Sequence, residues 1–198
     1  MPRSLNLEVR QRIVSAAYRL FVERGYKSVS MEDVAQSLGL KKANVFHYYP
    51  TKEALGLATL EMIRNESRAS GADGLERAED PIEYFVAIFD SMESSIGSLG
   101  PGSPNISSNI VVEMAGSHSA LQRQLAEDVQ YWVSVFADFL KSWKVRGYFR
   151  TDLEEESHAR LLVLMMQGTH VFWKATQDTR SFADASKWVR AALEPYKA

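Results

Sequence analysis

Apolar residues recur every three or four positions along most of this chain, a spacing that places them on one side of an α-helix. In the first segment the repeat runs through Val9, Ile13, Ala17 and Leu20. No segment shows the sustained alternation of apolar and polar residues that is typical of a half-buried β-strand. The periodicity therefore predicts an all-α protein of about nine helices.

Residues that start and stop helices divide this pattern into segments. Asn6, Ser30 and Thr51 each carry a short polar side chain that can accept a hydrogen bond from the first turn of a helix. Gly25 and Gly39 stand where helices are expected to end in a left-handed residue. Beyond these, the sequence predicts a polar linker at 70–80, a loop at 98–109 and helices at about 119–144, 153–176 and 182–193.

The composition excludes several kinds of site. The 198 residues include no cysteine, which removes disulfides, thiolate catalysis and cysteine metal sites. No apolar run reaches the length of a membrane span, and the N-terminus lacks the apolar region of a secretory signal. We therefore expect a cytoplasmic protein that has no cofactor and no metal site.

Charge is divided unevenly along the chain. Residues 1–60 hold nine Lys and Arg against five Asp and Glu, a balance of +4, whereas the remainder holds fourteen against twenty, or −6. A basic N-terminal part on an acidic body indicates that only the N-terminal part meets a polyanion. The alternative is chance asymmetry in a small sample.

Three residues between Met31 and Pro50 have the spacing of a helix-turn-helix. Ala35 is small enough for two helices to cross closely, and Gly39 supplies the positive φ of a tight turn. Val45 is the branched apolar residue that holds the second helix against the first. This spacing predicts a helix whose outer face enters the major groove of DNA.

The outer face of that second helix carries groups that suit DNA. The Asn44 amide can pair with an adenine edge, the Ala43 methyl can contact thymine, and His47 can reach a base or a phosphate. For the lysines, the alternative is an ordinary solvated surface. The residues predicted to contact DNA are Ser30, Lys41, Lys42, Ala43, Asn44, His47, Tyr48, Thr51 and Lys52.

Residues 13–55 resemble the N-terminal domain of the TetR family of transcriptional regulators through "AAYRLF", "SMEDVA", "LGL" and "TKEAL" in that order. The resemblance implies a three-helix DNA-binding domain at 7–53, with its helix-turn-helix at 31–50, joined to a helical ligand-binding and dimerisation domain at 54–198. Four departures bear on the phosphate contacts: Lys41 replaces the usual Ser or Thr cap, Ala43 a common Gly, Val29 a frequent Thr, and Phe46 a Tyr whose hydroxyl often reaches DNA.

The C-terminal part is rich in aromatic and sulfur-containing side chains, which suits a cavity for a small apolar or aromatic effector. The alternative is plain core packing, which Met and Phe also serve. The residues predicted to line the pocket are Phe89, Met92, Glu113, Trp132, Phe136, Met166, His170 and Trp173.

The last two predicted helices are apolar over more than one face, so they need cover from several sides. Gly168 would allow a second helix to approach closely. We expect a homodimer through a four-helix bundle, as the resemblance also implies. The residues predicted at this interface are Leu161, Leu164, Gly168, Val171, Phe172, Trp188 and Val189.

These features predict a sequence-specific DNA-binding regulator, and specifically a repressor that a small effector releases from a palindromic operator. The alternative is an activator or an effector-independent regulator, because its helix-turn-helix would look identical. A helical enzyme is a more distant alternative, since the sequence shows no nucleophile–base motif, phosphate loop or metal-ligand pair.

Overall fold

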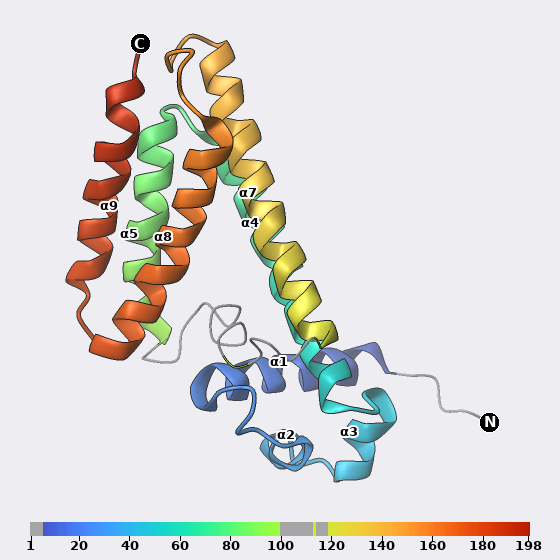
Figure 1. Cartoon of the computed structure of the whole chain (residues 1–198). Coiled ribbons are helices and arrows are strands. Elements are labelled where there is room, and N and C mark those ends of the chain that lie inside the picture. Colours follow the sequence, from blue (N-terminus) through green and yellow to red (C-terminus); the bar gives the residue numbers. More distant parts are fainter. Residues whose placement is uncertain (1–5, 100–112, 114–118) are drawn as a thin grey trace. The chain divides into compact units, whose positions relative to one another are not determined.

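The computed structural model describes residues 6–99, 113 and 119–198, and these residues form helices joined by short turns (Figure 1). Eight α-helices and one turn of 3₁₀ helix occur in this part of the chain, with no β-strand, which confirms the all-α prediction. Phe149 and Lys197 form one isolated antiparallel bridge. The helices are α1 (Leu7–Arg24), α2 (Met31–Ser37), α3 (Lys42–Tyr48), α4 (Lys52–Arg77), α5 (Pro81–Leu99), α7 (Ala120–Val145), α8 (Glu155–Thr176), α9 (Arg180–Leu193) and η1 (Glu194–Tyr196).

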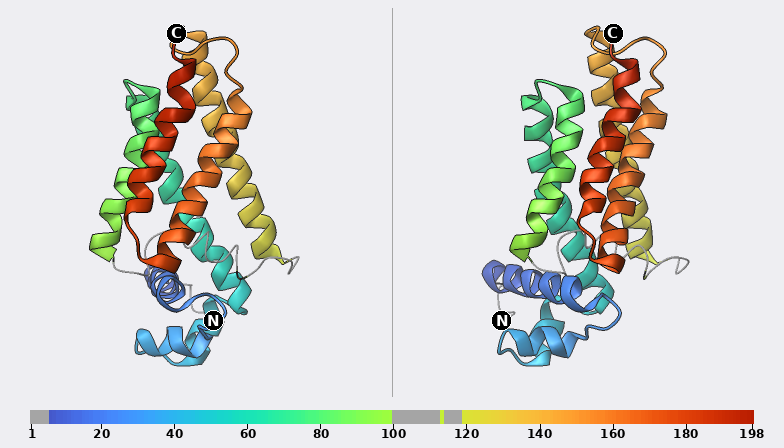
Figure 2. Two further views of the ribbon diagram at one scale, coloured as in Figure 1. Left: turned by 60° about the vertical axis from the view of Figure 1, so that its left-hand side comes forward. Right: turned by 90° about the vertical axis from the view of Figure 1, so that its left-hand side faces the viewer.

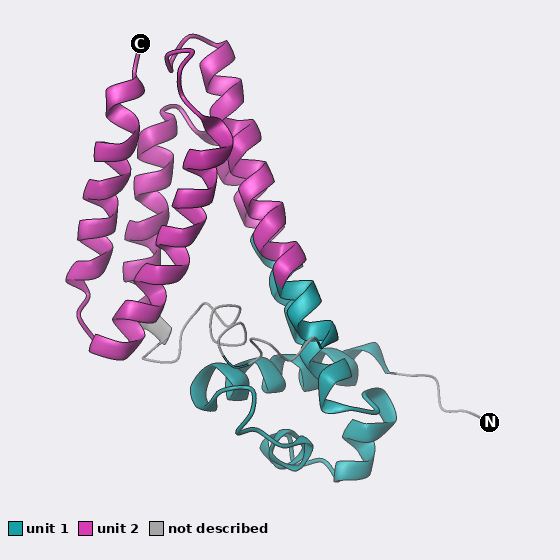
Figure 3. Ribbon diagram, viewed as in Figure 1, with its two compact units in different colours: residues 1–67, 105–125 teal, residues 68–104, 126–198 magenta. Residues whose placement is uncertain are grey.

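The chain divides into two compact units (Figure 3). Unit 1 consists of residues 1–67 and 105–125, and unit 2 of residues 68–104 and 126–198. The long helices α4 and α7 each contribute to both units. These units are defined by packing, so the functional boundary expected between residues 53 and 54 stays a prediction.

Unit 1 forms around the apolar faces of α1 and the short helices α2 and α3. Ile13, Ala17, Ala35 and Val45 are all completely buried in one cluster. The side chain of Asn6 accepts a hydrogen bond from the backbone N–H of Glu8 at 2.9 Å, which caps α1. The apolar residues that recur along α1 are thus the ones that it buries in the core of unit 1.

Unit 2 is a bundle in which α9 packs against both α5 and α8 (Figure 2). Aromatic rings fill its core: the centroids of Phe85 and Phe136 lie 5.1 Å apart in an edge-to-face arrangement. Val189 and Leu193 of α9 are completely buried in the same cluster. The loop predicted at 98–109 lies almost wholly outside the described residues, apart from the end of α5.

The linker predicted at 70–80 is wrong, because α4 continues to Arg77. The two glycines of this segment lie within α4 and both serve close packing. A Cβ at Gly71 would collide with the ring of Trp132, and one at Gly74 would lie 3.1 Å from the ring of Tyr84. The glycines therefore let aromatic rings approach the α4 backbone, at a cost of about 1 kcal/mol each in helix propensity.

The next helix, α5, begins at Pro81, directly after Asp80. The carboxylate of Asp80 accepts hydrogen bonds from the backbone N–H groups of Ile82 and Glu83 at 2.8 and 3.1 Å, and so caps α5. Its second oxygen accepts from the hydroxyl of Tyr148 at 2.6 Å. None of the helices in the described part of the chain is both long and apolar enough to cross a membrane.

Candidate nucleic-acid interface

Helices α2 and α3 are joined by a tight turn at the end of unit 1 (Figure 1). Ser30 and Asp33 form a capping box at the start of α2, in which Ser30 Oγ accepts from the Asp33 N–H at 3.1 Å and Asp33 Oδ2 accepts from the Ser30 N–H at 2.7 Å. Gly39 has a φ of +66°, and an added Cβ there would strain the turn. Ala35 and Val45 are completely buried where the helices meet.

Burial of Val45 determines which side of α3 faces outward. Of the predicted DNA-contacting residues on this helix, Lys42, Ala43, Asn44 and His47 are exposed, and so is Lys41 just before it. Tyr48 is only half-exposed and packs at the edge of the core. The structure therefore brings an amide, an imidazole, a methyl group and amines onto one short surface.

Phe46 also lies on this surface, although the sequence prediction left it out. Its side chain is 39% exposed, and the amine of Lys42 lies 5.9 Å from the centre of its ring. The same amine is 3.6 Å from a carboxylate oxygen of Glu32, so its charge is shared with α2. The sequence could have indicated this exposure, because Phe46 lies between Val45, predicted to be buried, and His47, predicted to face outward. We define the recognition face as Lys42, Ala43, Asn44, Phe46 and His47.

The start of α4 differs in part from the prediction. Thr51 Oγ1 accepts a hydrogen bond from the Ala54 N–H at 3.0 Å and caps the helix, as expected. The amine of Lys52, expected to contact DNA, instead donates to the backbone carbonyl of Lys27 at 3.0 Å and lies 4.6 Å from the centre of the Tyr26 ring. Lys52 therefore ties α4 to the turn after α1.

The same turn is held from a second side by Glu113. Its carboxylate accepts hydrogen bonds from the backbone N–H groups of Tyr26 and Lys27 at 3.2 and 2.7 Å. A Cβ at Gly25, where φ is +84°, would lie 2.5 Å from Glu113 Oε1, so glycine gives the carboxylate its access. Glu113 was predicted to line a ligand pocket; instead it belongs to unit 1 and binds this turn.

Burial and charge perturb two groups in this cluster. Burial raises the pKa of the Tyr26 phenol to about 12, and the carboxylates of Glu53 and Glu113 add to the shift. Burial lowers the pKa of the Lys52 amine, although Glu113 and Asp33 oppose that change. The Lys52 amine already has the Lys27 carbonyl and the Tyr26 ring as partners, and these contacts leave it less free to bind a phosphate.

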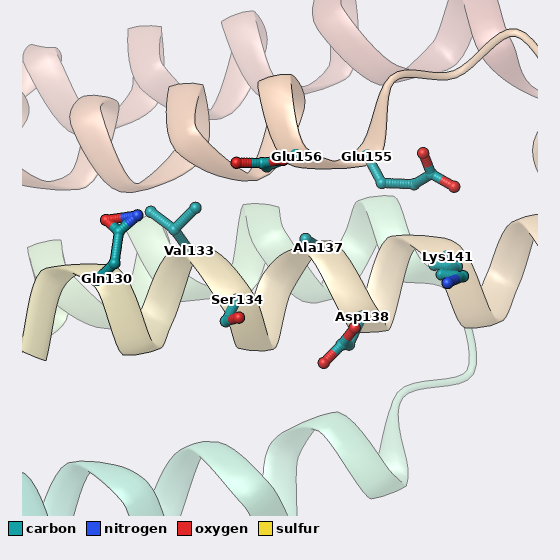
Figure 4. Close-up of a pocket in the computed structure, with 8 residues that line it drawn as sticks. All are labelled: Gln130, Val133, Ser134, Ala137, Asp138, Lys141, Glu155 and Glu156. Atoms are coloured by element: carbon teal, nitrogen blue, oxygen red, sulfur yellow. The ribbon is translucent and has the colours of Figure 1, made fainter. Parts of the chain in front are cut away.

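In unit 2 the structure contains a cavity of about 310 Å³ between α7 and α8 (Figure 4). It shares no residue with the predicted pocket. Two of its three carboxylates already bind cations: Glu155 pairs with Lys144 at 2.6 Å and Glu156 with Arg160 at 2.8 Å. The lining residues are Gln130, Val133, Ser134, Ala137, Asp138, Lys141, Glu155 and Glu156.

Most residues of the predicted ligand pocket pack within unit 2. Phe89 and Phe136 are buried in the main core, and Met92, Trp132 and Met166 lie at its edge. These residues fit the alternative of core packing, and the prediction that they line a pocket stays untested.

His170 and Trp173 form a separate buried pair on α8, with ring centroids 5.7 Å apart. His170 is 1% exposed, and neither of its ring nitrogens has a hydrogen-bond partner. Burial, with a smaller effect from the charge of Lys174, lowers the pKa of His170 to about 4. A buried polar group without a partner is costly and calls for an explanation.

The outer side of α8 carries a row of exposed apolar residues. Leu164 is 61% exposed and Trp188 of α9 is 68% exposed. Val189, predicted with them, is completely buried in the core of its own unit and cannot face a partner. We define the apolar strip as Leu161, Leu164, Gly168, Val171, Phe172 and Trp188, all of which are exposed.

Within residues 6–99, 113 and 119–198, no group of three or more His, Cys, Asp or Glu side chains is placed to hold a metal ion. The described site offers hydrogen bonding, positive charge and apolar contact on the exposed side of α3, which suits a groove of DNA better than a small substrate.

Comparison with known proteins supports this interpretation. Residues 13–59 match the family described as "Bacterial regulatory proteins, tetR family". The chain is 24% identical over 165 residues to the HTH-type transcriptional repressor DhaR of Mycobacterium sp. (strain GP1), covering 81% of this chain and 79% of that protein. It is also 24% identical over 162 residues to the negative transcriptional regulator IcaR of Staphylococcus epidermidis, covering 71% and 85%.

Solved structures share the fold over the full length of the chain. A TetR-family regulator from Cytophaga hutchinsonii superimposes with a TM-score of 0.87 at 18% identity, covering 99% of both chains. A regulator from Saccharomonospora viridis, solved in complex with choline, gives 0.78 at 20% identity, covering 96% of this chain and 97% of that one. The family match, the named relatives and the helix-turn-helix geometry lead to one conclusion: the chain is a DNA-binding transcriptional regulator whose N-terminal domain is of the TetR type.

Proposed function

We propose that this regulator is a homodimeric repressor that binds a near-palindromic operator and releases it when a small molecule binds. The observation that carries the proposal is the recognition face, which presents Asn44 and His47 outward because Val45 is completely buried. In this proposal residues 7–53 bind DNA, residues 54–198 bind the effector and the second subunit, and the protein works in the cytoplasm on bacterial DNA.

The proposed DNA contacts divide into two kinds. Asn44 and Ala43 read base edges in the major groove, through an amide to adenine and a methyl to thymine. Lys41, Ser30 and Thr51 lie at the starts of helices and contact phosphates, which fix the position of the protein without reading sequence. Lys42 shares its charge with Glu32, so we assign it a weaker phosphate contact than Lys41.

Repression is favoured over activation by the relatives. DhaR is named as a repressor and IcaR as a negative regulator, and both match most of this chain. A regulator with the same recognition helix could also activate transcription, so a reporter assay must separate the two. Repression predicts that deleting the protein raises expression from the operator-containing promoter.

The apolar strip supports the dimer. Its α8 members follow one another at intervals of three, four, three and one, which places them on one side of the helix. An exposed row of this kind marks a protein interface, and a symmetric pairing buries each copy against its counterpart. A two-fold dimer then places two α3 helices in successive major grooves, about 34–36 Å apart or a multiple of that distance.

His170 supports the effector. A neutral imidazole has one donor and one acceptor nitrogen, and both are buried without partners beside Trp173. The two nitrogens point away from each other, so one hydroxyl group can pair with only one of them. A small aromatic or apolar molecule with two polar groups would satisfy both and stack on the ring, and one with a single hydroxyl group would satisfy one. We propose that such a molecule favours the conformation that has lower affinity for DNA.

A gel shift tests the proposal directly. The full chain is titrated against DNA from upstream of its own gene and against a scrambled fragment of equal length and composition, at two salt concentrations. The proposal requires preference for the upstream DNA that persists at the higher salt concentration. Equal affinity for both fragments would show that binding is only electrostatic and would contradict it.

A further inference from the structure

Phe46 is an apolar ring on a surface that otherwise offers polar and small groups. Its phenyl group is 39% exposed and belongs neither to the core cluster of unit 1 nor to the partly buried residues packed against it. Single exposed apolar residues are common on protein surfaces and carry no meaning alone. The position of Phe46 on the recognition face is what gives it meaning.

The ring is next to another apolar group that faces the same way. Ala43 precedes Phe46 by three positions, and residues at this spacing on a helix lie about 5–6 Å apart. The Ala43 methyl is exposed as well. Ala43 and Phe46 thus form a small apolar patch within the recognition face, flanked by Lys42 and His47.

A phenyl ring can make few favourable contacts with DNA. It has no donor for a phosphate and no acceptor for a base amine, so the hydroxyl contact available to a tyrosine is closed to it. In the major groove, the apolar group presented by a base pair is the 5-methyl of thymine. An apolar side chain facing the groove therefore distinguishes thymine from the other bases.

We infer that Phe46 is a specificity-determining residue, whose ring contacts the 5-methyl group of a thymine in each operator half-site, beside the methyl contact of Ala43. This inference rests on the proposed function, because it requires α3 to enter the major groove. The distance between Ala43 and Phe46 spans one to two base steps of about 3.4 Å, so the two thymines lie within two steps of each other.

Deoxyuridine tests the contact without altering the base pair, because it differs from thymidine only by the missing 5-methyl. The operator is first selected from a random duplex pool with the full-length protein. Each thymine is then replaced in turn by deoxyuridine, and affinity is measured for the unchanged protein and for Phe46→Ala. Phe46→Tyr, which keeps the ring, and Asn44→Ala, which alters a polar reader of the same helix, are the matched controls.

The unchanged protein should lose about fourfold in affinity at each contacted thymine, the factor that one buried methyl group supplies. Phe46→Ala should be insensitive to deoxyuridine at one of these positions and remain sensitive at the other. Phe46→Tyr and Asn44→Ala should both retain the full sensitivity. Circular dichroism should show unchanged helicity, because the phenyl group lies outside the core.

Two results would overturn the inference. The first is an identical deoxyuridine profile for Phe46→Ala and the unchanged protein, since the ring would then contact sugar or nothing. The second is an operator at which no thymine methyl matters. In both cases an operator has been selected, so the proposed function stands; failure to select any operator would contradict the proposed function itself.

Discussion

The two units of the chain differ in how closely they follow the rule that apolar residues lie inside and polar residues outside. In unit 1 the core is apolar, and the histidine of the recognition face, His47, is exposed. Unit 1 exposes single large apolar side chains, Leu7 and Phe46, whereas unit 2 exposes a row that includes Leu164 and Trp188 and buries His170 without hydrogen-bond partners. Each departure costs stability in an isolated chain.

This difference between the units shows which kinds of binding site leave a trace in the structure of a single unbound chain. A DNA-binding surface is mostly polar and solvated before DNA arrives, so unit 1, apart from the single ring of Phe46, shows little penalty for being unbound. A subunit interface and an effector site both replace water by apolar or paired groups, so their unbound forms carry visible penalties. The following experiments remove these features one at a time.

The largest effect is expected at the apolar strip. In the proposed dimer, Leu164→Glu places a charge in the interface from each copy and removes two leucines that pairing would bury, which we expect to cost about 3–6 kcal/mol, or roughly 100- to 10,000-fold in the dimer dissociation constant. Sedimentation velocity should show a monomer with unchanged helicity. Val145→Glu, at an exposed apolar residue outside the strip, is the control. A dimeric Leu164→Glu protein would show that the strip does not pair two subunits.

The next effect is expected on the recognition face, where Asn44→Ala should cost about 1–3 kcal/mol at one operator position. The amide is exposed, so the thermal stability of the free protein should not change. Binding to scrambled DNA and the salt dependence should also stay the same. If operator and scrambled affinity fall together, Asn44 contacts the backbone and does not read a base.

The features of unit 1 that were predictable from sequence share one property, which is that neighbouring residues determine them. Gly39 has positive φ because the turn between two adjacent helices requires it, and Ser30 caps α2 because Asp33 stands three residues later. Helical periodicity extended the all-α prediction to the whole chain for the same reason. Helix caps and turns of this kind can be predicted from sequence without knowing which other parts of the chain the segment contacts.

The errors arise from contacts between residues far apart in sequence. Residues 70–80 were predicted to be a polar linker, and the aromatic rings that pack on Gly71 and Gly74 could not be foreseen because they lie in other helices. Glu113 and Lys52 were assigned to a ligand and to DNA, yet both hold the turn at residues 26–27. Val189 was assigned to an interface although it lies in its own core. Spacing shows that a residue is on a particular face of its helix, but not what covers that face.

A smaller effect separates two lysines that the sequence treats alike. Lys41 is exposed and its side chain does not cap α3, so Lys41→Ala should lower the salt slope of DNA binding by about one per subunit. Lys52 donates to Lys27 and covers the Tyr26 ring, so Lys52→Ala should instead lower the melting temperature and leave the slope nearly unchanged. Affinity measured across a salt series, together with thermal unfolding, distinguishes them. If Lys52→Ala lowers the slope of DNA affinity against salt and Lys41→Ala does not, Lys52 is the phosphate contact.

The smallest effect is expected at His170, and it should be a gain in stability. His170→Leu replaces two unpartnered nitrogens by apolar groups of similar volume, which we expect to add about 1–2 kcal/mol, or roughly 2–8 °C in melting temperature. The same variant should no longer respond to a hydroxyl-bearing aromatic probe such as phenol. Loss of stability on this substitution would mean that the imidazole makes a contact in solution that the structure lacks.

Acid provides an independent check on the same residue. The folded protein holds the pKa of His170 at about 4, against 6.5 for an unperturbed histidine, so between these values the unfolded chain binds more protons than the folded one. The stability that depends on neutral His170 is therefore complete above about pH 6.5 and is lost as the pH falls toward 4. His170→Leu lacks this titration. Its stability advantage over the unchanged protein should therefore grow as the pH falls from about 6.5 to about 4. Thermal unfolding of both proteins at several pH values measures the difference, and a constant difference would show that His170 already has a partner or stays charged in the folded state.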